Sequence, residues 1–397
     1  MPAPGSGTVA ARSGKLRSRW HRATVAERFM LALLLLFMIK QVGNVILFPP
    51  FTGHDEVAHY AYTRTVATEH RVPIIPDLKA WRTAWEAQEP RPGDILPTDL
   101  FRYCRYVLDW NYCDEPTWEN NPPVAVTLAG QIYPHGWQYA ANHPPLFYLL
   151  MTPLYLATDS FSPAQQQYVM RAATIPLGMA IVLLTFLIAR LLFLRDQFIQ
   201  VIAPSFVAFQ TQVSYEGAMV NNDILLIFMF TLLLYLLIRG LRHGMTLGSA
   251  AVIGLVIGLG LLSKATMMSA LPIVAVVMIV AIGVRQVRRW ITLGAVTAIV
   301  AALIAAPWYI FLYRTYGNLS ALPQVKALQY SHTYRGKTPP TILDQLFNRD
   351  FASMRWSETW GQFGWRLIPL PNWILWTIGI PLLLITIASL AGLAWST

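Results

Sequence analysis

Charged side chains are scarce in this sequence. They make up 13% of its 397 residues, against roughly 25% in a typical soluble domain. Hydrophobic residues reach 55%, the mean hydropathy is +0.44, and several apolar runs approach the length of about 20 residues that a bilayer core requires. This composition excludes an ordinary soluble domain. It predicts a polytopic membrane protein whose first partner is the lipid bilayer.

Acidic residues are scarcer than basic ones. The chain has 20 Asp and Glu against 30 Lys and Arg, which gives a net charge of +10. A basic balance of this kind can indicate a nucleic-acid partner. Here the basic residues mostly flank the apolar runs, as the topology signals of membrane proteins do, and no nucleic-acid-binding motif accompanies them. We therefore expect no nucleic acid among the partners.

The first apolar run lacks the small-residue cleavage site that follows a secretory signal peptide. We therefore interpret residues 1–28 as a basic cytoplasmic tail that precedes the first span. Its positive charges are Arg12, Lys15, Arg17, Arg19, Arg22 and Arg28.

Eight apolar runs predict an all-α fold, a polytopic transmembrane helical bundle with a long extracytoplasmic first loop that carries juxtamembrane helices. The arginines that follow the second, fourth and sixth runs, such as Arg195, Arg242 and Arg288, fall on the side of the N-terminus. The positive-inside rule makes that side cytoplasmic. The predicted spans are residues 29–49, 171–194, 199–215, 222–240, 246–263, 266–284, 291–312 and 372–392.

One apolar segment does not fit this count. Residues 143–157 form a run of only about 15 residues with three prolines, and a crossing there would move every later arginine cluster to the outer side. We therefore predict a juxtamembrane or re-entrant helix on the outer face, which is tolerated where protein buries its broken ends.

Inverted internal repeats of the kind found in many transporters are absent. The chain divides into the tail, residues 1–28, and one transmembrane domain, residues 29–397. That domain includes a first outer loop at 50–170 and a second, basic outer loop at 313–371. Long loops escape the positive-inside rule, so the charge of the second loop does not change the predicted topology.

Cysteine occurs only twice, as Cys104 and Cys113 in the first outer loop. An oxidising compartment would permit a disulfide that closes a small loop, although pairing depends on a geometry that the sequence does not give. The same loop contains tryptophans that suit either stacking on sugar rings or anchoring at the membrane interface. These are Trp81, Trp85, Trp110, Trp118 and Trp137.

The most informative motif is Gly53-His-Asp-Glu-Val-Ala-His59, which begins a few residues beyond the first span. Proton acceptors beside a lipid surface suit the transfer of a group from a lipid carrier to a hydroxyl or amide. Adjacent residues on a helix point about 100° apart, so we expect one acid to face the site and the other to support it. Asp55 is the candidate base and Glu56 its neighbour. The alternative is a helix start with Asp55 as N-cap.

Asp55 and His59 share a helical face and could both ligate a divalent cation. Two ligands are too few to define a metal site. We therefore assign no metal ligand and leave a divalent cation open as a cofactor.

Two further polar pairs are expected on the outer side. Asn142 and His143 precede two prolines, where free backbone amides would suit a phosphate; a simple helix start is the alternative. Asn222 and Asp223 open the fourth span, either as an ordinary cap or as polar groups that face the same space as Asp55.

Two lysines lie at or within the spans. Lys264 lies at the outer turn between the fifth and sixth spans, where it could extend to water or hold a lipid-linked phosphate as a point charge. Lys40 interrupts the first span. Ionisable residues within spans tend to face the bundle interior, so Lys40 is predicted to be structural or to support the site.

The order of these motifs resembles that of the C-type (GT-C) membrane glycosyltransferases, most closely the bacterial and archaeal branch related to protein mannosyltransferases and lipopolysaccharide sugar transferases. The resemblance covers about residues 29–375. It rests on Asp55-Glu56, His143-Pro-Pro-Leu-x-Tyr148, Asn222-Asp223, Ser263-Lys264, Pro307-Trp-Tyr309, Arg314-x-Tyr-Gly317 and Trp360-Gly-Gln-Phe-Gly-Trp365.

The resemblance implies an enzyme that takes a hexosyl or pentosyl sugar from a polyprenyl-phosphate donor and places it on a glycan, lipid or protein acceptor. It further implies a plasma (inner) membrane location with a cytoplasmic N-terminus and an extracytoplasmic active site. Asp55, with Glu56 beside it, would deprotonate the acceptor during a single displacement that inverts the anomeric carbon. Substrate contacts would come from His59, Asn142, His143, Asn222, Asp223, Lys264 and Arg314.

Two other classes of protein remain open. A transporter or flippase of lipid-linked saccharide also needs polar residues at the membrane boundary. Transporters, however, tend to bind near mid-membrane in broken helices, whereas the polar residues here collect on one face. A surface-polysaccharide polymerase or ligase shares the carrier and compartment, and the basic segment 313–371 keeps that alternative open.

Overall fold

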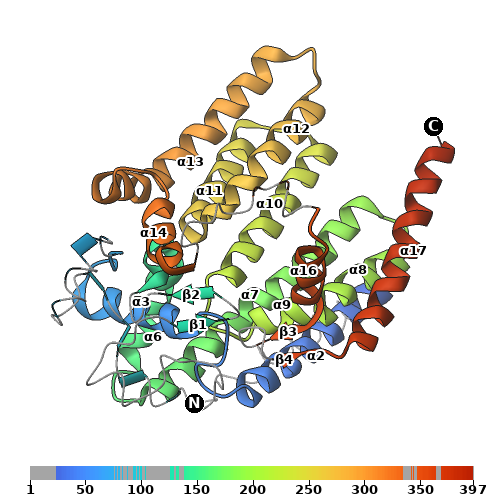
Figure 1. The fold of residues 1–397 in the computed structure, drawn as a ribbon. Coiled ribbons are helices and arrows are strands. Elements are labelled where there is room, and N and C mark those ends of the chain that lie inside the picture. The colour runs from blue at the N-terminus through green and yellow to red at the C-terminus, as the bar shows by residue number, and fades with distance from the viewer. Residues whose placement is uncertain are drawn as a thin grey trace, which may run out of the picture.

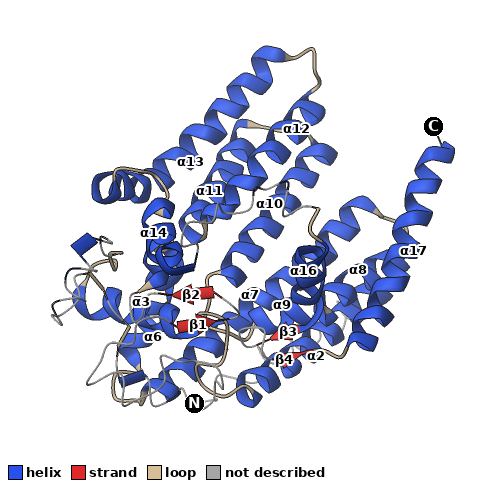
Figure 2. Cartoon of the chain, in the orientation of Figure 1, coloured by secondary structure: helices blue, strands red, loops and turns tan. Residues whose placement is uncertain are grey.

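In a computed structural model, the chain folds almost entirely into helices, with two short antiparallel ribbons among the described residues (Figures 1 and 2). The structure describes residues 24–75, 138–333, 347–363 and 368–396, with short stretches and single residues between 77 and 133 and at 341 and 343. The predicted disulfide between Cys104 and Cys113 lies outside the described residues, as does most of the basic tail. The predicted all-α class is confirmed.

Apolar helices build the body of the molecule, and other elements connect them. The helices of the body are α2 (Val25–Leu47), α7 (Pro163–Leu192), α8 (Gln197–Phe209), α10 (Asp223–His243), α11 (Leu247–Ser263), α12 (Leu271–Ile282), α13 (Val287–Tyr316) and α17 (Asn372–Ser396). The remaining helices are α3 (Glu56–Glu69), η3 (Tyr139–Asn142), α6 (Leu146–Ala157), α9 (Thr211–Glu216), η4 (Ala265–Ala270), α14 (Leu322–Thr333) and α16 (Arg349–Gly361). The ribbons pair β1 (Val126–Leu128) with β2 (Gln131–Tyr133), and β3 (Gln362–Phe363) with β4 (Ile368–Pro369).

Each predicted span falls on helical structure. Among the described residues, five helices are long and apolar enough to cross a membrane: α2, α7, α10, the continuous pair η4–α12, and α13. The helices α8 and α11 and the apolar part of α17 are shorter than the roughly 20 residues of a full crossing. The molecule is therefore an all-α membrane protein, and the count of eight spans stays a prediction.

The prediction of one continuous helix over residues 199–215 is wrong. Gln210 has an extended backbone (φ −64°, ψ 121°) that ends α8, and its side chain caps α9 by accepting a hydrogen bond from the backbone of Val213. Lys40 of α2 donates to the carbonyl of Ala208 and to the hydroxyl of Ser214. Polar side chains thus replace the helical hydrogen bonds that the break removes. Lys40 accordingly has a structural role here.

The two ends of the bundle differ in chemistry. At one end, Arg190 pairs with Glu27 at 2.8 Å, Arg242 donates to the carbonyl of Leu192 at 2.8 Å, and Arg289 donates to a carbonyl of the turn before α11 at 3.0 Å. The loops that lead into α3, α10 and η4 meet at the other end, where hydrogen bonds join them. The basic connections therefore share one end, as the sequence predicted. Which end faces the cytoplasm remains a prediction.

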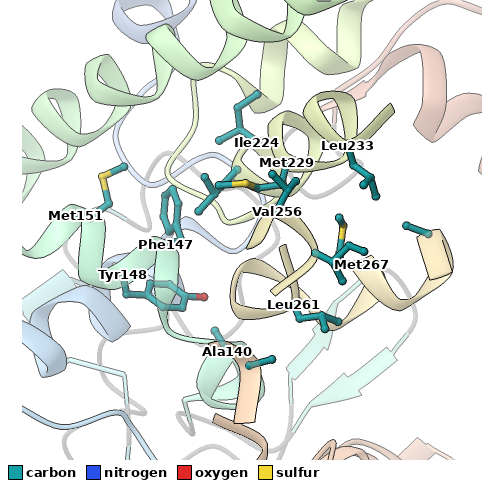
Figure 3. Packing of buried hydrophobic residues seen from close by; sticks show 14 of the residues in the cluster. Ala140, Phe147, Tyr148, Met151, Ile224, Met229, Leu233, Val256, Leu261 and Met267 are labelled. Carbon is teal, nitrogen blue, oxygen red and sulfur yellow. The ribbon is translucent and has the colours of Figure 1, made fainter. Parts of the chain in front are cut away.

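Helix α6 is the apolar segment that was expected not to cross. Its 12 residues span about 18 Å at 1.5 Å per residue, well below the roughly 30 Å of a bilayer core. It lies beside α3 (Figure 1). Its residues Phe147, Tyr148 and Met151 join Ile224 of α10 and Val256 of α11 in one buried cluster (Figure 3). Helix α6 is therefore part of the packed core at this end of the bundle.

We expect positions near 135 and near 160 to lie on the same, outer side of the membrane. The measurement is labelling of single introduced cysteines with a membrane-impermeant thiol reagent, after replacement of Cys104 and Cys113. A cysteine near residue 195, between α7 and α8, serves as the control and should label only after permeabilisation. Labelling of the first two positions from opposite faces would contradict the topology and place Lys264 in the cytoplasm.

Helices α11 and α13 pack with their backbones in close approach. A Cβ at Gly254 would lie 2.5 Å from the carbonyl oxygen of Thr297, and one at Gly258 would lie 3.0 Å from that of Ala301. Glycines four residues apart allow this kind of packing between membrane helices. The contact fixes the end of α11, which leads into Lys264, relative to the rest of the bundle.

Candidate active site

A buried ion pair holds the loop between α2 and α3. The carboxylate of Glu56 accepts hydrogen bonds from Nε and Nη2 of Arg171 on α7 at 2.8 and 2.6 Å, and both side chains are fully shielded from solvent. It also accepts from the backbone N–H of Gly53 at 2.8 Å and of Val220 at 2.9 Å. A Cβ at Gly53 would lie 2.5 Å from the carboxyl carbon of Glu56, so this close approach requires glycine.

The remaining donors of Arg171 reach the chain beyond α2. They bind the carbonyl oxygens of Phe48 at 2.7 Å and Pro49 at 2.9 Å. Carbonyls at the end of a helix lack intrahelical partners and carry partial negative charge. Each buried charge is therefore both paired and hydrogen-bonded, which is the condition for burying it. The pair ties together the end of α2, the start of α3, helix α7 and the loop before α10.

Asp55 precedes α3 in a left-handed backbone conformation (φ 56°, ψ 9°), and its side chain does not cap the helix. Such a conformation costs about 1–3 kcal/mol in a residue other than glycine and is concentrated at functional sites. On either side, His54 donates its backbone N–H to the hydroxyl of Tyr215 at 3.1 Å, and the Asp55 carbonyl accepts from His59 at 2.9 Å. Asp55 therefore occupies the N-cap position of α3, as the alternative predicted, but its side chain makes no capping hydrogen bond.

The net effect of the surroundings is to raise the pKa of Asp55. Burial raises the pKa of the half-buried Asp55 carboxyl, and the negative charge of Asp223 raises it further. His54, Lys264 and the hydroxyl of Tyr139 lower the pKa and oppose this shift. Asp55 is therefore an acid whose protonation responds to the charges at this end of the bundle.

Lys264 and Asp223 form an ion pair between the end of α11 and the start of α10. The Lys264 ammonium lies 2.6 and 2.7 Å from the two oxygens of Asp223. The lysine side chain is 25% exposed and the aspartate side chain 40% exposed, so both can be reached from outside. The structure thus brings together two residues that were predicted separately from the sequence.

Glu216, at the end of α9, is a third acid of this region. Its carboxylate accepts hydrogen bonds from Asn221 and Gln212. Burial and then the charge of Asp223 raise the pKa of Glu216 to about 8. Across the described residues, no three His, Cys, Asp or Glu side chains are arranged to hold a metal ion.

His59, His143 and Asn222 belong to a chain of hydrogen-bonding contacts next to the Lys264–Asp223 ion pair. The amide nitrogen of Asn222 lies 3.1 Å from Nδ1 of His143 and 3.0 Å from the carbonyl oxygen of Ser263. The hydroxyl of Tyr148 lies 3.4 Å from Nδ1 of His143 and 2.9 Å from Nδ1 of His59. His59 is buried, so its side chain belongs to this chain of contacts, and its direct contact with substrate stays a prediction.

Two candidate residues have fewer contacts with the rest of the site. Arg314, in the last turn of α13, is exposed, and its side chain makes no hydrogen bond or ion pair with any residue that the structure describes. Asn142 ends η3 half-buried, directly before His143. A substrate contact by either residue remains a prediction.

Sequence reasoning gave no site role to Arg171, Glu216 or Tyr148, although Tyr148 is part of the motif that begins at His143. Helix α7 begins at Pro163, so Arg171 lies two turns inside it, where a charge needs a partner. This was the available signal, but the predicted span began at residue 171. For Glu216 and Tyr148, the sequence alone gave no sign of the contacts described above.

A search with the sequence among proteins of curated function finds no match. Two solved structures from Archaeoglobus fulgidus are similar at 16% identity. An oligosaccharyltransferase in the apo form has a TM-score of 0.47, with 82% of this chain and 33% of that chain covered. The archaeal oligosaccharyltransferase AglB in complex with an inhibitory peptide and a dolichol-phosphate has a TM-score of 0.46, with 90% and 37% covered.

This chain therefore spans about a third of the length of those structures. A family model described as "Predicted membrane protein (DUF2142)" matches residues 37–396. Because the match includes nearly the whole sequence, the chain belongs to the DUF2142 family of membrane proteins.

Proposed function

We propose that this membrane protein is a glycosyltransferase that moves a sugar from a polyprenyl-phosphate carrier to a glycan, lipid or protein acceptor. The observation that carries the proposal is the setting of Asp55. A half-buried acid with a raised pKa stands in a strained backbone conformation, beside the Lys264–Asp223 pair. In the proposal this end of the bundle is extracytoplasmic in the plasma membrane, because the arginines collect at the opposite end.

In the proposed reaction, Asp55 accepts the proton of the acceptor hydroxyl while the acceptor oxygen attacks the anomeric carbon. The bond between that carbon and the phosphate oxygen breaks, and its electron pair leaves with the polyprenyl phosphate. This single displacement inverts the anomeric centre and needs no covalent intermediate on the protein. The raised pKa of Asp55 supports the role, because a carboxylate with a raised pKa is a stronger base.

Lys264 is proposed to hold the phosphate of the carrier. Its ammonium is a compact positive charge with three donors, and Asp223 fixes its position at 2.6 Å. A phosphate oxygen that approaches the exposed side of the ammonium would share it with Asp223. The lysine would then stabilise the negative charge that develops on the phosphate as the glycosidic bond breaks.

The test of this function is a radiolabelled sugar-transfer assay with a panel of polyprenyl-phosphate sugars. Membranes that contain the protein should form labelled product, and matched membranes without it should not. A folded protein that moves lipid-linked saccharide across vesicles without transferring sugar would contradict the proposal and support the flippase alternative.

Lys264→Ala should weaken binding of a polyprenyl-phosphate analogue by about tenfold to a hundredfold, the loss expected when a hydrogen bond to a charged group is removed. The measurement is a titration of the purified protein in detergent, with thermal unfolding as the check on folding. Lys326→Ala is the matched control, because Lys326 is exposed on α14 and should be neutral. Unchanged affinity in the Lys264 variant would assign this lysine to the membrane interface instead.

A further inference from the structure

The orientation of the Asn222 side chain is fixed by its surroundings. Its amide nitrogen lies 3.0 Å from the carbonyl oxygen of Ser263, and a carbonyl oxygen can only accept a hydrogen bond. The group that points at Ser263 must therefore be the amide nitrogen and not the amide oxygen. The same nitrogen lies 3.1 Å from Nδ1 of His143, so its second N–H donates to that ring nitrogen.

This contact determines where the His143 ring carries its proton. Because Nδ1 accepts from Asn222, it must be unprotonated, and a neutral ring then has its proton on Nε2. Burial and the positive charge of Lys264 lower the pKa of His143 to about 3, against the opposing charge of Asp223. The ring of His59, whose centroid lies 5.6 Å away, is a further titratable neighbour. Because its pKa is lowered, the His143 imidazole stays neutral at physiological pH.

Two atoms of this pair have no partner among the described residues. One is Nε2–H of His143, a half-buried residue. The other is the buried amide oxygen of Asn222, and an unpartnered buried acceptor costs about 1–3 kcal/mol. Hydroxyl groups can satisfy both atoms, since they donate and accept. An ionised phosphate only accepts, so it could accept from Nε2–H but has no proton to donate to the Asn222 oxygen.

We propose that Asn222 fixes His143 as the neutral Nε2–H tautomer and that the two residues bind hydroxyl groups of the sugar. The histidine N–H donates to a hydroxyl oxygen, and the Asn222 oxygen accepts a hydroxyl proton. The identification of the ligand as a sugar on a lipid carrier rests on the proposed function. His143 and Asn222 thus position the sugar, while Lys264 binds the phosphate.

The tautomer is measured by nitrogen NMR on the full chain labelled at its eight histidines, with the His143 signals assigned by difference from His143→Gln. We expect an unprotonated Nδ1 and a protonated Nε2, without titration between pH 8 and pH 5. In Asn222→Asp the carboxylate can only accept, so Nδ1 should become protonated. A wild-type ring that is protonated on Nδ1, or that titrates near the ordinary pKa of about 6.5, would overturn the inference.

The ligand is tested with two probes, polyprenyl phosphate and polyprenyl-phosphate glucose. We expect the sugar-bearing probe to shift the Nε2 signal and the bare phosphate to leave it unchanged. Equal shifts from both probes would overturn the assignment to sugar hydroxyls, and so would the absence of a shift across a panel of sugars. A protein that shows the sugar-dependent shift but transfers no sugar would contradict the proposed enzyme activity and support this binding site.

A matched pair of substitutions separates hydrogen bonding from ring shape. The amide nitrogen of His143→Gln can replace Nε2–H, whereas His143→Ala has no donor. We expect His143→Ala to bind polyprenyl-phosphate glucose about threefold to tenfold less tightly than the wild type, the usual loss for one neutral hydrogen bond. His143→Gln should recover most of this affinity. Equal weakening in both variants, with both proteins folded, would contradict donation from Nε2.

Discussion

Asp55→Asn should lower the rate of sugar transfer by about a hundredfold to ten-thousandfold, the contribution typical of a positioned general base. Asparagine has the same shape and tolerates a left-handed backbone, so the conformation at φ 56° should persist. It cannot accept a proton from the acceptor hydroxyl. The measurement is the initial rate of radiolabelled transfer per folded molecule, with thermal unfolding to show that the fold is kept.

Asp159→Asn is the matched control for this substitution. Asp159 is an exposed acid that follows α6 in the same outer segment, and its loss should change the rate by less than about twofold. Near-normal transfer by Asp55→Asn would remove the proposed mechanism and favour a non-catalytic role in handling lipid-linked sugar.

The pH profile gives an independent check on Asp55. Only the ionised carboxylate can act as the base, and burial raises its pKa above the ordinary value for aspartic acid. The rate in the wild type should therefore fall as the pH is lowered through this raised pKa. The residual rate of Asp55→Asn should lack that step.

The bundle could be predicted because long apolar runs have few alternatives in a membrane. Backbone groups in lipid must be satisfied within the segment, so an apolar run of span length becomes a helix. The arginines then indicate which connections share an end, as the contacts of Arg190, Arg242 and Arg289 show. The break at Gln210 was missed because it depends on Lys40, which comes from a helix far away in the sequence.

That these candidate residues would lie close together was easier to predict than the contacts between them. Asp55, His143, Asn222 and Lys264 lie near the ends of elements that the alternation of the helices brings to one end of the bundle. The sequence does not show which groups meet there. That Lys264 binds Asp223 and that Asn222 contacts His143 depends on how α10 and α11 pack, which spacing along the chain cannot specify.

The sequence also left open which of the two adjacent acids, Asp55 and Glu56, faces the site. Neighbours on a helix point apart, and the structure turns Glu56 into the protein toward Arg171 while Asp55 stays half-exposed. Glu56 is thereby placed to hold the loop that carries Asp55. Direct participation of Glu56 in catalysis stays a prediction.

Glu56→Ala and Arg171→Ala should each lower the free energy of unfolding by about 3–5 kcal/mol, because each leaves one buried charge without its partner. The pair Glu56→Met and Arg171→Met in one protein should lose less than either alanine variant, since no unpaired charge remains. Unfolding in detergent, followed by temperature or denaturant, measures these differences. Exposed Glu69→Ala, at the other end of α3, is the control and should be close to neutral.

The transfer rate of Glu56→Gln shows whether Glu56 only holds the loop that carries Asp55 or also acts on the substrate. If Glu56 only holds the loop, unfolding should become easier, and the rate per folded molecule should fall less than in Asp55→Asn. If the rate collapsed while unfolding was unchanged, Glu56 would have to act on the substrate itself. The four hydrogen bonds that its carboxylate accepts from Arg171, Gly53 and Val220 argue for support. They occupy both oxygens, so a proton acceptor for the substrate must be sought in the neighbouring Asp55.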